Sequence, residues 1–532
     1  MVGYFTTYDG QPGAKLFRES IALTDETHFA SHDPLLESPH PLTTSEALFS
    51  ALDKNDVRYC HWKSNEHLDA GLAGETDLDV LVDRSHHRRW ERILADHGFK
   101  RFTTAEGYSR PPMTDYLGFD RETGSLIHLH THYQLVLGSA LKEYQVPWGE
   151  DILSSRVQDQ ETGVYTIDPT FELVLLLVRA AFKSGGWDKQ SEDSSAFPPD
   201  DIMREYRWLR SRTSVDDVVC LSGELLDQVA MGHVRVLLEQ DLSPSALATY
   251  RGYLRDRLEP YQTYGRMARY VKQKQAIIRK VKRHLARTYD LPYHVRRGPA
   301  TGGMVIAVIG ADGSGKSTMS SMVAEWLSSD LTVYEIYMGS DTGVTLPKRL
   351  LRRVKADVKQ RGGSSSSQAE SSSPNSGSVL KGVLRRPFRL ASYLVDAHDK
   401  RVKLRRLVRA RNRNAVVLTD RFPQNQVMGI NDGPKLDSWM QSWNPLRRWL
   451  ATWERKPFEI AADDPPDVVI KLLVDPETAS RRSPHENAEQ QREKCKIIDS
   501  LEFDDATVIE IDANRSRDAV AQHIKRRLWR TI

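Results

Sequence analysis

The alternation of apolar and polar positions divides the chain into stretches of different character. Residues 1–42 are rich in Ser, Thr, His, Pro and Asp without a sustained apolar period, which is typical of a loosely ordered leader. Over residues 43–168, a helix is predicted for SEALFSALDKN, a strand for DLDVLVD and a second helix for HHRRWERILADHG. This alternation predicts an α/β or α+β domain in that range.

From residue 169 to 287 the pattern turns helical and predicts a helical extension. Its most apolar part is FELVLLLVRAAFK, which predicts a buried helix. The last helix, expected over residues 270–287, carries Lys and Arg on most faces and an apolar stripe of Val271, Ile278, Val281 and Leu285. Residues 288–303 end in RRGPATGG and are predicted to be a linker.

A second α/β unit is predicted over residues 304–532. Its strands are expected at Met304–Ile309, Leu331–Met338, Ala415–Thr419, Val468–Val474 and Ala506–Ile511. A long basic helix over Val379–Asn412 precedes the third strand, and a helix closes the chain. The Ser-rich segment 362–378 cannot bury a core and is expected to be a mobile loop. The expected fold class is α/β: a parallel sheet with flanking helices, preceded by the α+β domain and its helical extension.

Composition narrows the class of protein. A chain of 532 residues, with 39% hydrophobic and 28% charged positions, is expected to fold into two or three globular domains. Its net charge of +3 is nearly neutral and neither predicts nor excludes binding to nucleic acid. The three cysteines, Cys60, Cys220 and Cys495, form no CxxC pair, so neither a disulfide framework nor a cysteine zinc site is predicted. No segment resembles a signal peptide or a membrane span, and a cytoplasmic location is expected.

The most specific motif follows the strand that ends at Ile309. It is GADGSGKST, which meets GxxxxGK[ST] between a predicted strand and a predicted helix. Glycines let the backbone wrap closely, so that successive amides and the helix amino terminus point at phosphates. Lys316 is expected to reach the β and γ phosphates of ATP, and the Ser317 hydroxyl to coordinate Mg²⁺. The residues expected to bind the nucleotide are Gly310, Ala311, Asp312, Gly313, Ser314, Gly315, Lys316, Ser317 and Thr318.

A glycine-rich turn without a ligand is the alternative for this motif. It is disfavoured because a lysine among helix-end amides is poorly placed without an anion to neutralise it.

This motif resembles the P-loop of thymidylate kinases and related nucleoside monophosphate kinases. Asp420-Arg421-Phe422 follows the third strand and is similar to that family's DR(Y/F/H) motif, at the strand end where open α/β sheets bind ligands. The resemblance assigns Asp420 to the metal shell or to acceptor activation, and Arg421 to contact with the acceptor phosphate. An ion pair at a strand end is the alternative for these two residues.

A second segment, DPETASRR, resembles the stretch that precedes the lid of these kinases. The resemblance makes Arg481 or Arg482 a clamp on the transferring phosphoryl group or on the adenine side of ATP. A solvated helix face is the alternative. The acceptor region matches no thymine pocket, and Asp432-Gly433-Pro434 is similar to thymidylate-kinase-like proteins of polysaccharide gene clusters. The expected acceptor is therefore a nucleotide such as dTMP or a carbohydrate-like compound.

In the first domain, GETDLDVLVD resembles the metal-binding strand of nucleotidyltransferases. Alternation along the strand turns Asp77 and Asp79 to the same side, where both carboxylates could hold Mg²⁺. Lys63-Ser64 could lie nearby.

Such enzymes take a third carboxylate from a later strand. Here the strand SLIHLHTHYQL offers His128, His130 and His132 instead. Histidine is a poor ligand for Mg²⁺, so three alternatives stand: nucleotidyl transfer has been lost, zinc or iron binds, or an acid such as Asp115 or Asp120 comes from elsewhere. A further alternative is that these histidines are ordinary half-exposed strand residues that bind no ligand.

Two basic helices, over residues 272–287 and 381–413, could contact anionic lipid, a polyanionic acceptor or nucleic acid. Aromatic residues are not interleaved along them, which disfavours nucleic acid, and solvated faces are the alternative. The sequence leaves a homodimer open.

The leading expectation is ATP- and Mg²⁺-dependent phosphoryl transfer to a small acceptor. The alternatives are a nucleotide-gated regulatory or scaffold protein, and a kinase joined to a nucleotidyltransferase in nucleotide-sugar or polysaccharide biosynthesis.

Overall fold

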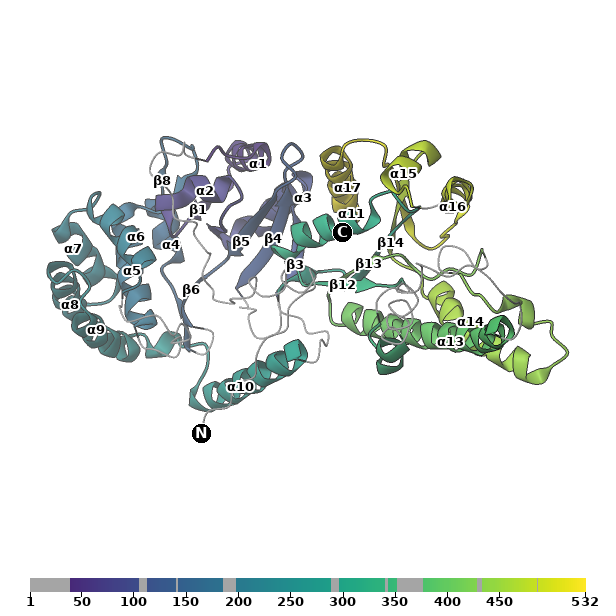
Figure 1. Cartoon of the computed structure of the whole chain (residues 1–532). Coiled ribbons are helices and arrows are strands. Elements are labelled where there is room, and N and C mark those ends of the chain that lie inside the picture. The colour runs from purple at the N-terminus through teal and green to yellow at the C-terminus, as the bar shows by residue number, and fades with distance from the viewer. Residues whose placement is uncertain are drawn as a thin grey trace, which may run out of the picture.

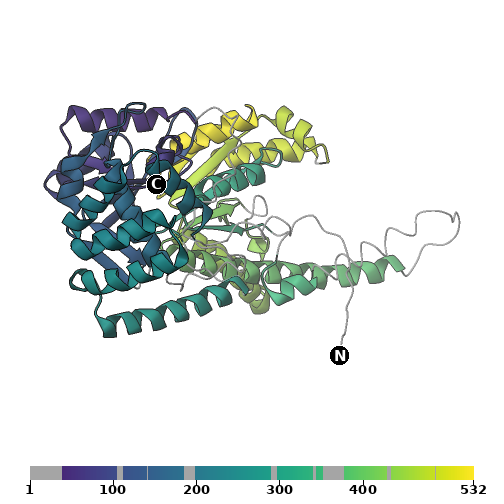
Figure 2. The same cartoon turned by 90° about the vertical axis from the view of Figure 1, so that its left-hand side faces the viewer.

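The chain is described by a computed structural model over nearly all of the two predicted α/β units. The described residues are 39–104, 112–139, 142–184, 198–288, 296–339, 343–351, 377–427, 433–485 and 487–532. Most of the expected leader, most of the Ser-rich segment and Asp432 lie outside these residues. Within them, α/β structure is confirmed, with two large sheets, a two-stranded sheet and many helices (Figures 1 and 2).

The first sheet has eight strands in the order β10-β3-β4-β5-β2-β1-β9-β8, and a separate hairpin joins β6 to β7. The strands of this unit are β1 (Tyr59–His61), β2 (Leu78–Val82), β3 (Lys100–Thr103), β4 (Met113–Phe119), β5 (Leu126–His132), β6 (Leu135–Ser139), β7 (Lys142–Val146), β8 (Val157–Gln158), β9 (Tyr165–Thr166) and β10 (Gly298–Pro299). Most neighbours are antiparallel, but β1 runs parallel to β9 and β2 runs parallel to β5, with Asp79 beside His130. The segment expected to be a linker contributes β10, which pairs with β3.

The two faces of this sheet differ in chemistry. On one face Leu78, Val80 and Ile127 pack in a continuous apolar core with helix α3. On the other face the apolar residues lie only at the two ends, and the middle carries Asp79, Asp115 and three histidines. The helices around this sheet are α1 (Thr43–Lys54), α2 (Leu68–Leu72), α3 (His87–Asp96) and α4 (Gly149–Ser155), with short 3₁₀ turns at Asn65–His67 and Arg84–His86.

The helical extension covers one end of that second face, as Figure 1 shows. Its central helix begins where Asp168 accepts hydrogen bonds from the amides of Thr170 and Phe171, with Pro169 in the first turn. Apolar side chains all round this helix explain its burial at the centre of the extension. The extension consists of α5 (Pro169–Lys183), α6 (Asp200–Arg210), α7 (Val215–Leu225), α8 (Gln228–Glu239), α9 (Pro244–Arg257) and α10 (Arg266–Thr288), with a 3₁₀ turn at Glu259–Tyr261.

The second sheet is entirely parallel, with five strands in the order β12-β13-β11-β14-β15. Its strands are β11 (Met304–Gly310), β12 (Val333–Tyr337), β13 (Val416–Asp420), β14 (Val468–Leu473) and β15 (Thr507–Asp512). The strand that leads into the predicted phosphate loop is central, so the carboxyl ends of β13 and β14 lie on either side of it. This arrangement is compatible with a P-loop type of fold.

Helices cover both faces of the parallel sheet, with α11 and α17 on one face and α13 and α16 on the other. The helices of this unit are α11 (Lys316–Ser328), α13 (Gly377–Arg411), α14 (Pro445–Asp463), α15 (Pro476–Arg482), α16 (Ala488–Ser500) and α17 (Arg517–Thr531), with a 3₁₀ turn at Asp437–Trp439. None of the helices in the described residues is both long and apolar enough to cross a membrane.

The two sheet units share a core. Trp529 of α17 stacks on Phe102 and Phe119 of the first sheet, with ring centroids 6.2 and 5.8 Å apart, and the Trp326 ring of α11 closes the cluster. The indole of Trp529 donates to the carbonyl of Gly98 at 3.1 Å. Because these aromatic rings belong to one apolar cluster with both sheets, the two units are packed against each other rather than merely tethered.

Candidate functional site

The predicted phosphate loop joins β11 to α11 at the carboxyl edge of the parallel sheet. Gly313 has φ +83°, and a Cβ there would lie 2.5 Å from the carbonyl oxygen of Ala479 in α15. Gly315 has φ +88° and precedes the first residue of α11. The loop therefore needs glycine at 313 for both its backbone conformation and its contact with α15, and at 315 for the turn that starts the helix.

Lys316 is buried within this loop. Its ammonium donates to the carbonyl of Ala311 at 2.7 Å and lies 3.4 Å from Asp312 Oδ1. Burial lowers the pKa of Lys316, while the charge of Asp312 favours the protonated form. Asp312 also pairs with Lys494 at 2.6 Å and with Arg421 at 3.3 Å. These cations, Lys494 foremost, hold the pKa of Asp312 below its usual range although burial alone would raise it.

Ser317 and Asp420 meet across the sheet edge. The Ser317 hydroxyl donates to Asp420 Oδ2 at 2.6 Å, although the two residues are 103 positions apart. The second carboxylate oxygen of Asp420, Oδ1, is buried and has no hydrogen-bond partner among the described residues. A hydroxyl and a carboxylate with an unsatisfied oxygen are the hard oxygen donors that Mg²⁺ prefers, so these residues fit such an ion.

Arg421 follows Asp420 in a left-handed conformation, with φ 71°. Its amide donates to the carbonyl of Val308 on the neighbouring strand at 3.0 Å, and its guanidinium reaches Asp312. A non-glycine residue with such a φ stores strain, and it persists here because the strand pairing fixes the backbone. The strained turn places the guanidinium of Arg421 over the phosphate loop.

The remaining predicted residues of the loop differ in accessibility. Ala311 and Ser314 are buried, and the Ser314 hydroxyl has no hydrogen-bond partner in the described part of the chain. Thr318 is exposed in the first turn of α11. A Cβ on Gly310 would lie 2.4 Å from the Ser314 hydroxyl oxygen and 3.1 Å from the carbonyl oxygen of Leu472, so a side chain there would have to displace Ser314.

The two predicted clamp residues do not lie in the same surroundings as Lys316. Arg482 donates to the carbonyl of Ala513 at 2.8 Å, beyond the end of β15, and Arg481 is exposed. Instead, α16 supplies Lys494 to Asp312, and Gln491 donates to the carbonyl of Asp312 at 3.3 Å. Lys494 carries no motif signal in the sequence, because only the packing of α16 against the loop reveals it.

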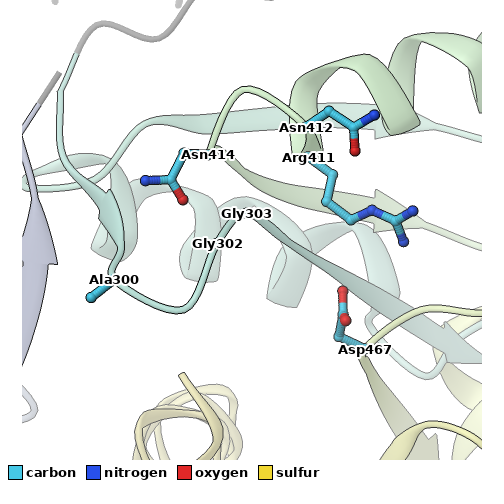
Figure 3. Close-up of a pocket in the computed structure, with 7 residues that line it drawn as sticks. All are labelled: Ala300, Gly302, Gly303, Arg411, Asn412, Asn414 and Asp467. Atoms are coloured by element: carbon cyan, nitrogen blue, oxygen red, sulfur yellow. The ribbon is translucent and has the colours of Figure 1, made fainter. Parts of the chain in front are cut away.

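An open depression of about 440 Å³ lies at the opposite edge of the parallel sheet (Figure 3). Its lining residues are Ala300, Gly302, Gly303, Arg411, Asn412, Asn414 and Asp467. They precede β11, β13 and β14, so the depression faces the amino ends of these strands. Arg411 pairs there with Asp464 through two contacts of 2.9 Å, and the Asp467 carboxylate accepts from the amide of Val305 at 2.7 Å. Ligands of open α/β sheets bind at the carboxyl ends, so this depression is separate from the phosphate loop.

The second group of candidate residues lies in the polar middle of the first sheet. Asp79 is buried, and one of its oxygens pairs with Lys63 at 3.0 Å. The other oxygen lies 3.0 Å from His132 Nε2 and 3.4 Å from His130 Nδ1. Asp77 contacts His128 Nδ1 and is partly exposed. The structure thus brings Asp77, Asp79 and all three histidines onto one face, as strand alternation predicts.

Of the two acids that sequence reasoning offered for this group, the structure brings in one. Asp115 of β4 is buried and lies 3.0 Å from His128 Nε2 and 3.1 Å from His130 Nε2. Asp120 was a wrong candidate, because its carboxylate caps α1 through Thr43 and Thr44 and closes its own turn with Thr123.

Two of the three histidines are not half-exposed strand positions, because His128 and His132 are buried, whereas His130 is partly exposed. Burial would lower the pKa of His130, but its contacts with Asp115 and Asp79 raise it to about 10.

Arg297 connects this polar group to the parallel-sheet unit. Its guanidinium donates to Asp115 Oδ1 at 3.0 Å, lies 3.3 Å from His130 Nε2 and pairs with Asp330 at 3.6 Å. Asp330 follows α11, the helix that begins at the phosphate loop. Sequence reasoning missed Arg297, since it lay within the stretch predicted to be a linker.

Comparison with known proteins gives a partial match. The chain is 25% identical over 224 residues to the uncharacterized ATP-binding protein YghR of Escherichia coli strain K12, which covers 42% of this chain and 85% of that protein. It is 28% identical over 231 residues to the uncharacterized ATP-binding protein YghS of the same strain, which covers 41% of this chain and 89% of that protein. No family model matches the chain. These similarities extend over less than half of the chain, to proteins whose names record ATP binding.

Proposed function

We propose that this protein binds ATP with Mg²⁺ at the loop between β11 and α11 and transfers a phosphoryl group to a small acceptor. The acceptor is a nucleotide, such as dTMP, or a carbohydrate-like compound. The observation that carries the proposal is the 2.6 Å contact between Ser317 and Asp420 beside a buried lysine in a glycine loop. The two similar proteins named for ATP binding add support.

Each side chain of the loop has a distinct role in this proposal. The amides of residues 310–318 and the amino terminus of α11 bind the phosphates. Lys316 exchanges its contacts with Ala311 and Asp312 for phosphate oxygens. Ser317 and Asp420 hold Mg²⁺, which when bound neutralises charge that develops on the phosphate oxygens.

In this proposal, Asp312 provides a negative charge at the place where the ATP phosphates bind. Its carboxylate lies 3.4 Å from the ammonium of Lys316, 3.3 Å from the guanidinium of Arg421 and 2.6 Å from the ammonium of Lys494. A triphosphate brings several negative charges to the same place and competes for these cations. Arg421 is then available to contact the acceptor phosphate, and Lys494 to contact the transferring group. Arg482 lies at the far side of the loop after β15 and is proposed to border the adenine rather than the phosphates.

Acceptor-dependent release of ADP tests the proposal. The full chain is incubated with ATP, Mg²⁺ and a panel of nucleoside monophosphates and sugars, and ADP is measured. We expect one chemical class to raise ADP release well above hydrolysis by water. Absence of ATP binding would show that the loop is not a nucleotide site.

A nucleotide-gated switch is the second candidate function. Arg297 favours it, because this side chain contacts both Asp330 next to α11 and Asp115 in the first unit, so a shift of α11 would reach the first sheet. The switch predicts ATP binding with slow hydrolysis that no small acceptor changes.

Nucleotidyl transfer at Asp77 and Asp79 would add a second activity. The same assay with detection of pyrophosphate distinguishes this activity from phosphoryl transfer.

A further inference from the structure

The polar middle of the first sheet contains two overlapping sets of potential metal ligands. In the first set, one ligand atom from each of Asp77, His128 and His130 lies within 4.8 Å of the other two. In the second set, the same holds for Asp79, His130 and His132. Strand β5, labelled in Figure 1, carries the three histidines, and its parallel pairing with β2 sets Asp79 beside His130. We propose that Asp77, His128 and His130 bind one divalent transition-metal ion, with Asp115 orienting both imidazoles.

The donor set selects the class of metal. Imidazole nitrogens suit Zn²⁺, Fe²⁺ and Co²⁺, whereas Mg²⁺ demands oxygen ligands. Two imidazoles and one carboxylate on a single face leave further coordination positions open. The Asp77 side chain is 38% exposed, so an ion and its remaining ligands can enter from the solvent side.

Contacts around the histidines resemble the outer shell of known metal sites. Asp115 is buried and lies within hydrogen-bond distance of His128 Nε2 and His130 Nε2. When Nε2 of His128 donates to Asp115, the Nδ1 lone pair points at Asp77, where the ion would lie. Metal-bound histidines usually donate their other ring N–H to a carboxylate in this way. Arg297 and Thr104 in turn hold Asp115 in place.

The charges of the group also favour a cation at this position. Asp77, Asp79, Asp115 and Asp330 face two permanent cations, Lys63 and Arg297, which leaves two negative charges that a divalent ion matches. Lys63 lies 3.0 Å from Asp79. It therefore repels an ion from the second set of ligands, and the ion is assigned to the first set.

Cobalt binding tests this proposal. The full chain is stripped with a chelator, dialysed and titrated with Co²⁺ alone while its visible absorption is followed. We expect about one equivalent to bind with the ligand-field bands of a nitrogen-ligated ion. His128→Gln should weaken binding at least tenfold, and Asp115→Asn should weaken it roughly 10–100-fold, as loss of an outer-shell partner does. His87→Gln, on the surface of α3, is the control and should bind Co²⁺ like the unaltered protein.

Thermal unfolding of each metal-free variant shows whether it is folded. If the His128→Gln variant does not fold, Asp115→Asn supplies the test. Equal Co²⁺ affinity in His128→Gln, Asp115→Asn and the control would overturn the proposal. The acids and histidines would then form a hydrogen-bonded network without a metal ion. Binding that survives His128→Gln but is lost in Asp420→Asn would place the ion at the phosphate loop and would overturn it equally.

A second inference concerns α10, whose apolar side faces solvent. This helix of 23 residues has nine Lys and Arg residues and no acid. Its half-buried positions include Arg269, Lys272 and Arg279, whereas its large apolar side chains are between 45% and 78% exposed. The exposed apolar residues are Met267, Tyr270, Val271, Ile277, Ile278, Val281 and Leu285. Successive positions turn by 100°, so these seven residues lie within an arc of roughly 120°.

We propose that α10 docks on an anionic lipid surface. In Figures 1 and 2 the helix runs along the lower edge of the molecule. Because its large apolar side chains are exposed, they can contact a flat surface. The exposed cations Lys274, within the stripe, and Arg266 and Lys282, at its edges, accompany these apolar residues, and an apolar stripe with nearby cations and no acid is the pattern of helices that lie in a membrane interface. Each cation near an anionic surface adds to this attraction. A nucleic acid would use the cations but not the apolar stripe.

Vesicle sedimentation tests this second proposal. The full chain should sediment with vesicles that contain phosphatidylserine and not with pure phosphatidylcholine, and salt should weaken the binding. Ile278→Gln together with Val281→Gln keeps the charge and should lower binding at least tenfold, because the apolar contact is lost. Val229→Gln with Val236→Gln removes exposed apolar side chains of α8 and serves as control. Equal binding by both double variants, or binding to RNA alone, would overturn the proposal.

Discussion

Replacing Lys316 by Ala is expected to lower the rate of acceptor-dependent ADP release at least roughly a hundredfold. The ammonium is buried at the phosphate loop and is held by Ala311 and Asp312, so its position is already set for a phosphate oxygen. Its removal takes away stabilisation of the charge that develops during transfer, which is worth several kcal/mol, on the order of 3. The measurement is ADP release at saturating ATP and acceptor, with ATP affinity measured separately.

The matched control is Lys456→Ala. This lysine lies on α14, has a half-exposed side chain and pairs with the neighbouring Glu459 through a contact of 3.5 Å. Its loss should leave both rate and affinity unchanged. If Lys316→Ala turned over like Lys456→Ala, the loop would not be where phosphoryl transfer occurs, and the proposed function would fail at its first step.

Replacing Trp529 by Ala is expected to lower the free energy of unfolding by roughly 3–5 kcal/mol. The ring is 6% exposed and fills the space between Phe102, Phe119 and Trp326. Its indole N–H also donates to Gly98, so the truncated side chain leaves both a cavity and an unsatisfied carbonyl. Denaturant unfolding followed by circular dichroism measures the change.

Trp443→Ala is the control for this effect. Trp443 is 88% exposed, and its removal should change stability by no more than about 0.5 kcal/mol. A Trp529→Ala protein as stable as the Trp443→Ala protein would show that the aromatic cluster does not hold the two sheet units together. The two units would then have to be treated as independent domains joined by the segment near Arg297.

Helices and strands could be predicted from the sequence where the apolar pattern that defines them lies within the segment itself. The strand before Gly310, the helix after Gly315 and the five strands of the second unit were found near their predicted positions, because each carries its own apolar period or turn residues. The amphipathic helix near residue 280 was also found, although it begins four residues earlier, at Arg266. The strand β12 is shorter at both ends than predicted, as expected for element boundaries.

The sequence by itself predicted the phosphate loop, because glycine, lysine and serine occur at the fixed spacing of that motif within nine consecutive residues. It also determined that Asp77 and Asp79 share a face, since strand alternation is a local rule. Only the tertiary structure decided that Asp115 rather than Asp120 joins the histidines, and that Lys494 and Arg297 reach the two sites. The physical reason is that strand pairing and helix packing bring together residues far apart in the chain, and no local period encodes which partner each will meet.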